Sequence, residues 1–219
     1  MKMNVLVACE ESQRVCVAFR EKGHNAFSCD IIECSGGHPE WHIKGDVTNI
    51  LNPYPIISTG KCIVFHTMDG LIHYVEKWDL IIAHPPCTYL SNAGARFLYP
   101  KGILNVERLK KGIEAKIFFM ALYNAECEKI CIENPIPSKV YELPPYSQTV
   151  QPYEHGHPVQ KKTCLWLKGL PLLQPTNIVE ERQSTKIAGN WFNKGGKDRQ
   201  KNRAKTFPGI AKAMAEQWG

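Results

Sequence analysis

A cysteine and a glutamate, each placed where a buried strand meets prolines, are the side chains of this 219-residue chain best suited to chemistry. Cys87 directly follows a Pro-Pro pair that closes an apolar run, and Glu133 closes a second apolar run two residues before Pro135. Carboxyl ends of parallel strands collect reactive groups at one edge of an α/β sheet. A thiol and an acid there suit covalent catalysis, in which the thiolate attacks an electron-poor carbon. A cysteine of this kind more often fills a buried turn, so the assignment depends on the rest of the chain.

The composition is typical of one globular domain. Hydrophobic residues make up 43% and charged residues 22% of the chain, which disfavours disorder and membrane spanning. The apolar start of about five residues is too short for a signal peptide, so we expect a cytoplasmic protein. Nine cysteines without regular spacing indicate free thiols. Two groups of residues could be considered as zinc ligands. The first is Cys29, Cys34, His38 and His42, and the second is Cys127 with Cys131. No metal is expected, because the sequence contains no C-x-x-C pair.

The first 50 residues have the order of a doubly wound nucleotide-binding fold. A strand over 4–9, a helix over 15–21 and a strand over 24–29 ending at Asp30 are predicted. In such folds the acid at this position accepts hydrogen bonds from ribose hydroxyls. The connecting loop 10–13 lacks the glycines of the dinucleotide fingerprint, so no pyrophosphate is expected on it.

The middle of the chain predicts an inserted β-hairpin over 62–75 around Asp69-Gly70, as a flap or an oligomer contact. A helix over 105–125 follows. Its apolar residues at helical spacing are expected to face the core, and they are Val106, Leu109, Ile113, Ile117 and Met120.

The last third predicts a strand over 129–132, an irregular segment over 137–158 and a strand over 163–167. A closing helix begins at Pro208 and packs on the core through Ile210, Ala211, Met214 and Trp218. Residues 1–219 thus form a single domain with a short basic loop over 170–205. Aromatic residues interleave the basic run at its end, which suits contact with phosphates, although such a run can also be a solvated face.

The motifs resemble those of the DNA cytosine-5 methyltransferase family. The resemblance rests on Pro85-Pro86-Cys87, on Glu133-Asn134-Pro135, similar to the family's Glu-Asn-Val, and on 45–48, similar to its Gly-Asp-Ile-Thr. Residues 156–163 match the family's Gly-x-Pro-Gln-x-Arg-x-Arg segment in part. The resemblance implies a Rossmann-like methyltransferase fold, with a mostly parallel sheet, helices on both faces and the inserted hairpin.

The resemblance also implies that S-adenosylmethionine binds at the ends of the first strands. Asp30 would take the ribose hydroxyls and Asp46 the adenine amino group, although aspartates at such positions also serve as helix caps or turn residues. The residues implied for the cofactor are Cys9, Glu10, Ser12, Asp30, Ile31, Asp46, Val47 and Pro85.

For the reaction, the resemblance implies methylation of carbon 5 of cytosine in DNA. Cys87 would attack carbon 6 of a cytosine rotated out of the duplex, and Glu133 would hydrogen-bond ring nitrogen 3 and the exocyclic amine. Lysines stand where the family has arginines, which keeps the positive charge but loses the bidentate fork. The residues implied for the substrate are Pro86, Ser91, Asn92, Asn134, Lys161, Lys162, Lys194, Lys197 and Arg199.

The chain has no room for a family-sized target-recognition domain between the last core strand and the closing helix. We therefore expect short, weakly selective contact with duplex DNA, or a contribution from a specificity partner or a second copy of the chain. A small enzyme of this kind suits a phage or mobile element. The alternatives are a methyltransferase of the same fold acting on RNA, a nucleotide or a modified pyrimidine, and a non-catalytic protein that binds nucleic acid or cofactor.

Overall fold

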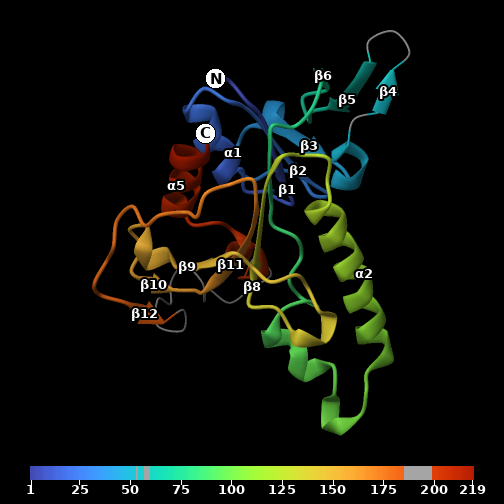
Figure 1. The fold of residues 1–219 in the computed structure, drawn as a ribbon, viewed down its shortest axis with the longest axis vertical. Helices are drawn as coiled ribbons and strands as arrows, with labels where there is room; N and C mark the ends of the chain where they lie inside the picture. Colours follow the sequence, from blue (N-terminus) through green and yellow to red (C-terminus); the bar gives the residue numbers. More distant parts are fainter. Residues whose placement is uncertain (53, 57–59, 185–198) are drawn as a thin grey trace.

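A seven-stranded sheet forms the centre of the molecule (Figure 1). The structure is a computed structural model and describes residues 1–52, 54–56, 60–184 and 199–219. The strand order is β3-β2-β1-β7-β8-β11-β9. The parallel strands are β1 (Asn4–Ala8), β2 (Asn25–Asp30), β3 (His42–Lys44), β7 (Leu80–Ala83) and β8 (Lys129–Pro135).

Two further strands complete the sheet. β11 (Thr163–Lys168) pairs antiparallel with β8, and β9 (Gln148–Val150) pairs antiparallel with β11. The chain leaves β1 toward β2 on one side and later returns to β7 on the other side of β1. The carboxyl ends of β1 and β7 therefore form the topological switch point at which open α/β sheets bind ligands.

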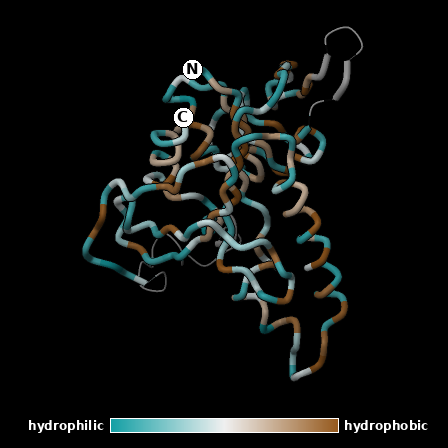
Figure 2. Tube along the Cα trace, viewed as in Figure 1, coloured by the Kyte–Doolittle hydropathy of each residue, from teal (hydrophilic) through white to brown (hydrophobic). Residues whose placement is uncertain are grey.

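Helices cover both faces of the sheet. α1 (Arg14–Glu21) and α5 (Pro208–Trp218) lie together on one face, where they bury Val5 and Val7 of β1. α2 (Val106–Tyr123) lies on the opposite face with Leu6 and Ala8. The alternation follows from the two-residue period of a strand, and Figure 2 shows the hydrophobic colours running through the central strands. The predicted Rossmann-like α/β fold is confirmed.

The predicted hairpin belongs to a small antiparallel sheet of β4 (Tyr54–Ile56), β5 (Gly60–His66) and β6 (Ile72–Val75). Phe65 and His73 each lie with their ring centroids 4.9 Å from that of Phe27 in β2. The hairpin thus covers part of the α2 face of the main sheet, a role that the sequence pattern left open.

α2 has nearly the predicted bounds, but its predicted core face is correct only in part, since Leu109 and Met120 pack against the core and the other three residues do not. Val106, Ile113 and Ile117 are exposed, whereas Gly112 and Phe119 are buried. A Cβ atom on residue 112 would lie 2.1 Å from the Tyr141 hydroxyl oxygen, so glycine allows that ring to pack directly against the helix. Periodicity identifies an apolar stripe, and tertiary packing decides which stripe is buried.

The irregular segment predicted over 137–158 is only partly irregular, because it contains β9, which pairing with β11 stabilises. β10 (Val159–Gln160) and β12 (Gln183–Ser184) form a short parallel pair, and α4 (Arg199–Ala204) precedes α5. No helix among the described residues is long and apolar enough to cross a membrane. The 3-10 turns are η1 (Pro39–Trp41), η2 (Val47–Ile50), η3 (Asn92–Phe97), η4 (Pro100–Gly102), η5 (Lys139–Tyr141) and η6 (Pro152–Glu154).

Candidate active site

Cys87 and Glu133 meet at the carboxyl ends of two adjacent parallel strands. Ala83 of β7 pairs with Ile132 of β8, and β8 continues through Glu133 to Pro135 because β11 still pairs with it there. Glu133 is therefore held within a strand, rather than in the loop after it. The side-chain amide of Asn134 donates to the Pro85 carbonyl at 3.2 Å and ties the Cys87 turn to β8.

The charges around Cys87 bear on its reactivity. Burial raises the pKa of the thiol, and the carboxylate of Glu133 acts in the same direction. The cations of Lys161 and Arg203 oppose this increase in the pKa. Cations next to a cysteine favour the thiolate, which is the nucleophilic form. The thiol is partly accessible, as a nucleophile requires.

His84 forms the closest polar contact of the site, and sequence reasoning missed it. Its Nδ1 atom lies 2.7 Å from Oε2 of Glu133, and both side chains are largely buried, at 9% and 14% exposure. Burial opposes ionisation of Glu133, but the hydrogen bond and charge of His84 outweigh it and hold the pKa of that carboxyl below its usual range. In turn, Glu133 and Glu10 raise the pKa of His84 against the effect of burial. The only signal in the sequence was a histidine directly before the Pro-Pro pair.

The two lysines predicted to bind substrate differ in position. Lys161 donates to the Arg203 carbonyl at 2.9 Å, and its charge acts on Cys87 and Glu133. Lys162 is exposed and acts on Cys164 instead. The two residues link β10 to β11, and only the first of them acts on the site.

Replacing Lys161 by methionine is expected to slow alkylation of Cys87 by iodoacetamide about fivefold near neutral pH. A pair of unit charges about 4 Å apart is worth about 1 kcal/mol in a wet environment, and the thiolate fraction falls when the cation is lost. The curve of alkylation rate against pH then moves to higher pH. Peptide mass spectrometry measures the rate at Cys87, and Lys162→Met is the matched control. Equal rates for the wild type and Lys161→Met contradict this assignment.

The other predicted substrate residues are spread along the edges of the site. Pro86 and Asn92 are exposed. Ser91 is buried, and its amide donates to the Cys87 carbonyl at 3.0 Å, so it shapes the turn. Asn134 is 2% exposed, and its Oδ1 atom has no hydrogen-bond partner in the described part of the chain. Lys194 and Lys197 lie outside the described residues, and Arg199 begins α4.

Three predicted cofactor residues gather at the ends of the first three strands. Cys9 directly follows β1, Asp30 ends β2 and Asp46 lies two residues after β3, and these three strands are neighbours in the sheet. Burial raises the pKa of the Cys9 thiol, and the carboxylates of Asp30 and Asp46 raise it further. Asp30 accepts from the Ile32 amide, and the adjacent Ile31 side chain is 74% exposed. A partly buried carboxylate beside an open apolar side chain fits the ribose and adenine of S-adenosylmethionine.

Other predicted cofactor residues have structural roles. Glu10 is buried and accepts hydrogen bonds from the amides of Val15 and Cys16, at 2.7 and 3.2 Å, so it stabilises the start of α1. Asp46 accepts from both the amide and the hydroxyl of Thr48, which is its alternative role as a cap. The side chain of Val47 is in the hydrophobic core, and Pro85 is buried. Ser12 is partly exposed.

The β1–α1 loop adopts glycine-like backbone conformations without glycine. Cys9 and Gln13 both have φ of 58°, in the left-handed region that costs energy for residues with a side chain. Gln13 is held there by hydrogen bonds to the backbone of His38, 2.8 Å to its carbonyl and 3.0 Å from its amide. The missing glycines of the fingerprint therefore did not prevent a tight strand-to-helix turn at this edge.

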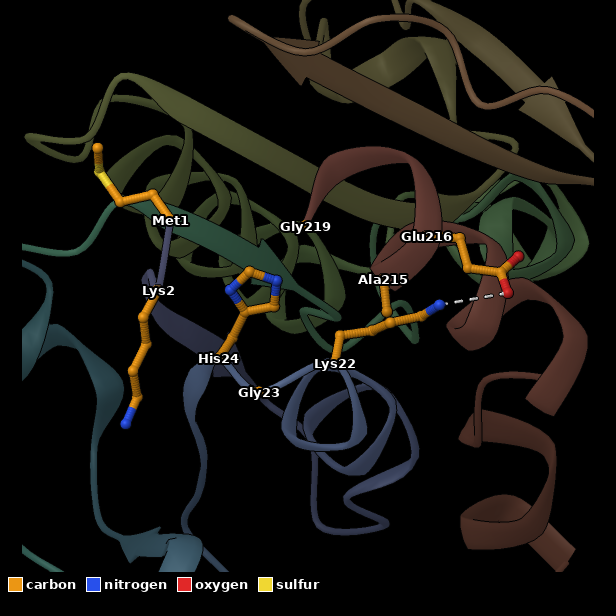
Figure 3. A pocket seen from close by; sticks show the side chains of 8 residues that line it. All are labelled: Met1, Lys2, Lys22, Gly23, His24, Ala215, Glu216 and Gly219. Carbon is orange, nitrogen blue, oxygen red and sulfur yellow. Dashed lines mark ion pairs between the residues drawn. The ribbon is translucent and has the colours of Figure 1, made fainter.

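A surface pocket lies at the opposite edge of the sheet, beside the residues that precede β1 and β2 (Figure 3). His24 lines it, together with the Lys22–Glu216 ion pair at 3.6 Å. These residues are at the amino ends of the strands, so the pocket has no part in the Cys87 site. Among the described residues no group of three or more His, Cys, Asp or Glu side chains is arranged to hold a metal ion.

Comparison with known proteins gives a distant likeness. No family model matches the sequence, and no curated protein matches it. A solved structure of the Entamoeba histolytica methyltransferase EhMeth is similar to this chain, with 13% sequence identity and a TM-score of 0.43. The match covers 90% of this chain and 62% of that one, so this chain spans less than two thirds of the length of EhMeth.

Proposed function

We propose that this protein transfers a methyl group from S-adenosylmethionine to carbon 5 of cytosine in DNA, through a covalent adduct with Cys87. The observation that carries the proposal is the joint placement of Cys87 and Glu133 at adjoining strand ends, with Lys161 acting on both. A nucleophile, an acid and a cation at one switch point are the groups that covalent activation of a pyrimidine needs.

Each group has a role in this reaction. The sulfur of Cys87 bonds to carbon 6 of the pyrimidine, and Glu133 faces nitrogen 3 and the exocyclic amine. Electron density then shifts to carbon 5, which takes the methyl group. A water molecule then takes the proton from carbon 5, the C–H electron pair re-forms the carbon 5–carbon 6 double bond, and the thiolate is expelled. Lys161 favours the thiolate at the start and again when the adduct breaks.

S-adenosylmethionine supplies the methyl group, and the residues placed to hold it are Asp30, Ile31 and Ser12. Asp30 is the last residue of β2 and Ile31 follows it, one strand away from the switch point. We further propose duplex DNA as the nucleic acid, held by Lys161 and Arg203 together with other basic residues of the 170–205 segment. Extraction of a base costs a few kcal/mol of stacking and pairing, which phosphate contacts must offset.

The test is a trapping experiment with duplex DNA containing 5-fluorocytosine, which cannot lose its substituent at carbon 5. Wild-type protein with tritiated S-adenosylmethionine is expected to form a denaturant-resistant complex, and Cys87→Ser is expected to form none. Cys62→Ser, in the hairpin, is the matched control and should trap DNA like the wild type. RNA and free nucleotides with the same base analogue are run in parallel. Trapping on those substrates alone overturns the DNA assignment, and no transfer to any of them overturns methylation.

A further inference from the structure

We propose that His84 is a positioning residue for Glu133, and that the two side chains act as one proton-holding pair. The inference rests on the proposed function and extends it to a residue that the resemblance to the cytosine-5 family does not assign. Three observations carry it: the short contact between the two side chains, its burial, and the second nitrogen of the imidazole, which has no hydrogen-bond partner in the described part of the chain.

The contact fixes which oxygen of Glu133 is available. Both hydrogen bonds that the described structure gives to Glu133 fall on Oε2, from His84 Nδ1 at 2.7 Å and from the Thr206 hydroxyl at 3.4 Å. Thr206 lies just before α5, so two elements hold the same oxygen. Oε1 is left to face a pyrimidine edge. A side chain anchored on one oxygen is oriented for donation from the other.

The second ring nitrogen of His84, Nε2, has an unusual environment for a buried polar atom. Nε2 of His84 is buried and has no hydrogen-bond partner among the described residues. The charged groups that act on His84 are Glu133 from β8, Glu10 from the end of β1 and Lys161 from the end of β10. Both carboxylate oxygens of Glu10 already accept hydrogen bonds from amides at the start of α1. A proton on Nε2 is therefore buried without a direct acceptor, which disfavours the imidazolium form relative to a fully paired one.

The pair has two forms with the same number of protons. In one, His84 carries protons on both nitrogens and Glu133 is a carboxylate. In the other, His84 is neutral with its proton on Nδ1, and Glu133 carries a proton on Oε1. A cytosine nitrogen 3 accepts hydrogen bonds, so its arrival selects the second form. Closely coupled groups titrate as a pair and not as separate residues.

The addition step balances between Cys87, Glu133 and the base. The Cys87 thiolate bonds to carbon 6, the electron pair of the carbon 5–carbon 6 double bond moves between carbons 5 and 4, and the pair of the carbon 4–nitrogen 3 double bond moves to nitrogen 3, which takes the proton from Oε1. Glu133 becomes a carboxylate, and the Nδ1–H group of His84 still donates to Oε2 and stabilises it. Carbon 5 would then take the methyl group that S-adenosylmethionine supplies, a water molecule would take the proton from carbon 5, and that C–H electron pair would re-form the carbon 5–carbon 6 double bond as the thiolate leaves. The proton on nitrogen 3 returns to Glu133.

A double-mutant cycle tests the pairing in the reaction. His84→Asn keeps a donor near Nδ1 but cannot hold a second proton. We expect at least a tenfold lower single-turnover methylation rate on duplex DNA, with the Kd for the duplex unchanged within twofold. In a Glu133→Gln background the same change is expected to alter the rate less than twofold, because the partner through which His84 acts is gone. His66→Asn, at an exposed residue of β5, is the control.

A second measurement separates this inference from the proposed function. The imidazole of His84 is titrated by NMR in the free protein, and its pKa is expected to fall when Glu133 is replaced by glutamine. If methylation is observed and the two substitutions act additively, or His84→Asn has no effect, the inference is wrong and the function stands. An unchanged pKa of His84 in Glu133→Gln also overturns the pairing. A wild-type protein that methylates no cytosine overturns both the function and the role of His84 in it.

Discussion

Glu133→Gln is expected to reduce the rate of methyl transfer to duplex DNA by about 10²–10⁴-fold, the usual contribution of a positioned acid or base. Glutamine has the size of glutamate and accepts the hydrogen bond from His84, but it cannot deliver a proton to nitrogen 3 of the base. The loss is therefore expected in the rate at saturating DNA and cofactor and not in binding. Single-turnover assays with tritiated S-adenosylmethionine measure the first quantity, and fluorescence anisotropy of labelled duplex measures the second.

The matched control for this change is Glu128→Gln. Glu128 lies one residue before β8, and its ion pair with Lys77, at 3.7 Å, is exposed. Exposed pairs of this kind contribute about 0–1 kcal/mol to stability. The control is expected to methylate DNA within twofold of the wild-type rate. A Glu133→Gln protein that retains more than a third of the wild-type rate contradicts the proposed role of the acid.

The sequence was sufficient to place Cys87 and Glu133, because both follow from local rules. An apolar run that ends at prolines marks the end of a buried strand, and parallel strands deliver their ends to one edge. The sheet order then made the two strands neighbours. His84 was missed because its role depends on a partner 49 residues away across that pair of strands. No local pattern distinguishes such a histidine from one in the core.

The remaining differences between the predictions and the structure have the same cause. One residue type can serve several structural or functional roles, and its tertiary contacts determine which role it has. Glu10 was predicted to line the cofactor site, and the structure shows that its carboxylate accepts hydrogen bonds from two amides at the start of α1. Lys161 and Lys162 are equivalent in sequence, and only the direction in which the chain enters β11 separates them. The apolar stripe of α2 is buried only in part, through Leu109 and Met120, since Tyr141 packs at Gly112 on another side of the helix.

His84→Leu is expected to lower the free energy of unfolding by about 3–5 kcal/mol at mildly acidic pH, the usual cost of removing one partner from a buried ion pair. The His84–Glu133 pair is buried on both sides, and leucine leaves the Glu133 carboxyl without its main partner. Urea unfolding at a series of pH values measures the effect. His66→Asn, which changes an exposed side chain, is expected to stay within about 0.5 kcal/mol of the wild type.

The pH dependence of that difference follows from the two shifted groups. The pKa of folded His84 is raised above its ordinary value of 6.5, so its contribution is complete below that pH and is lost as pH rises through the folded pKa. The pKa of folded Glu133 is lowered below 4.5, so its contribution is complete above that pH and is lost as pH falls through the folded pKa. Glu10, whose pKa burial raises to about 6, also interacts with the charge of His84, which lowers that pKa; this smaller part of the difference is lost as pH falls through about 6, while the larger part from Glu133 persists. The difference between wild type and His84→Leu is therefore expected to be largest between pH 4.5 and 6.5 and to shrink on both sides. A difference that is constant from pH 4 to 9 would mean that leucine only disturbs packing and that the two side chains carry no charge interaction.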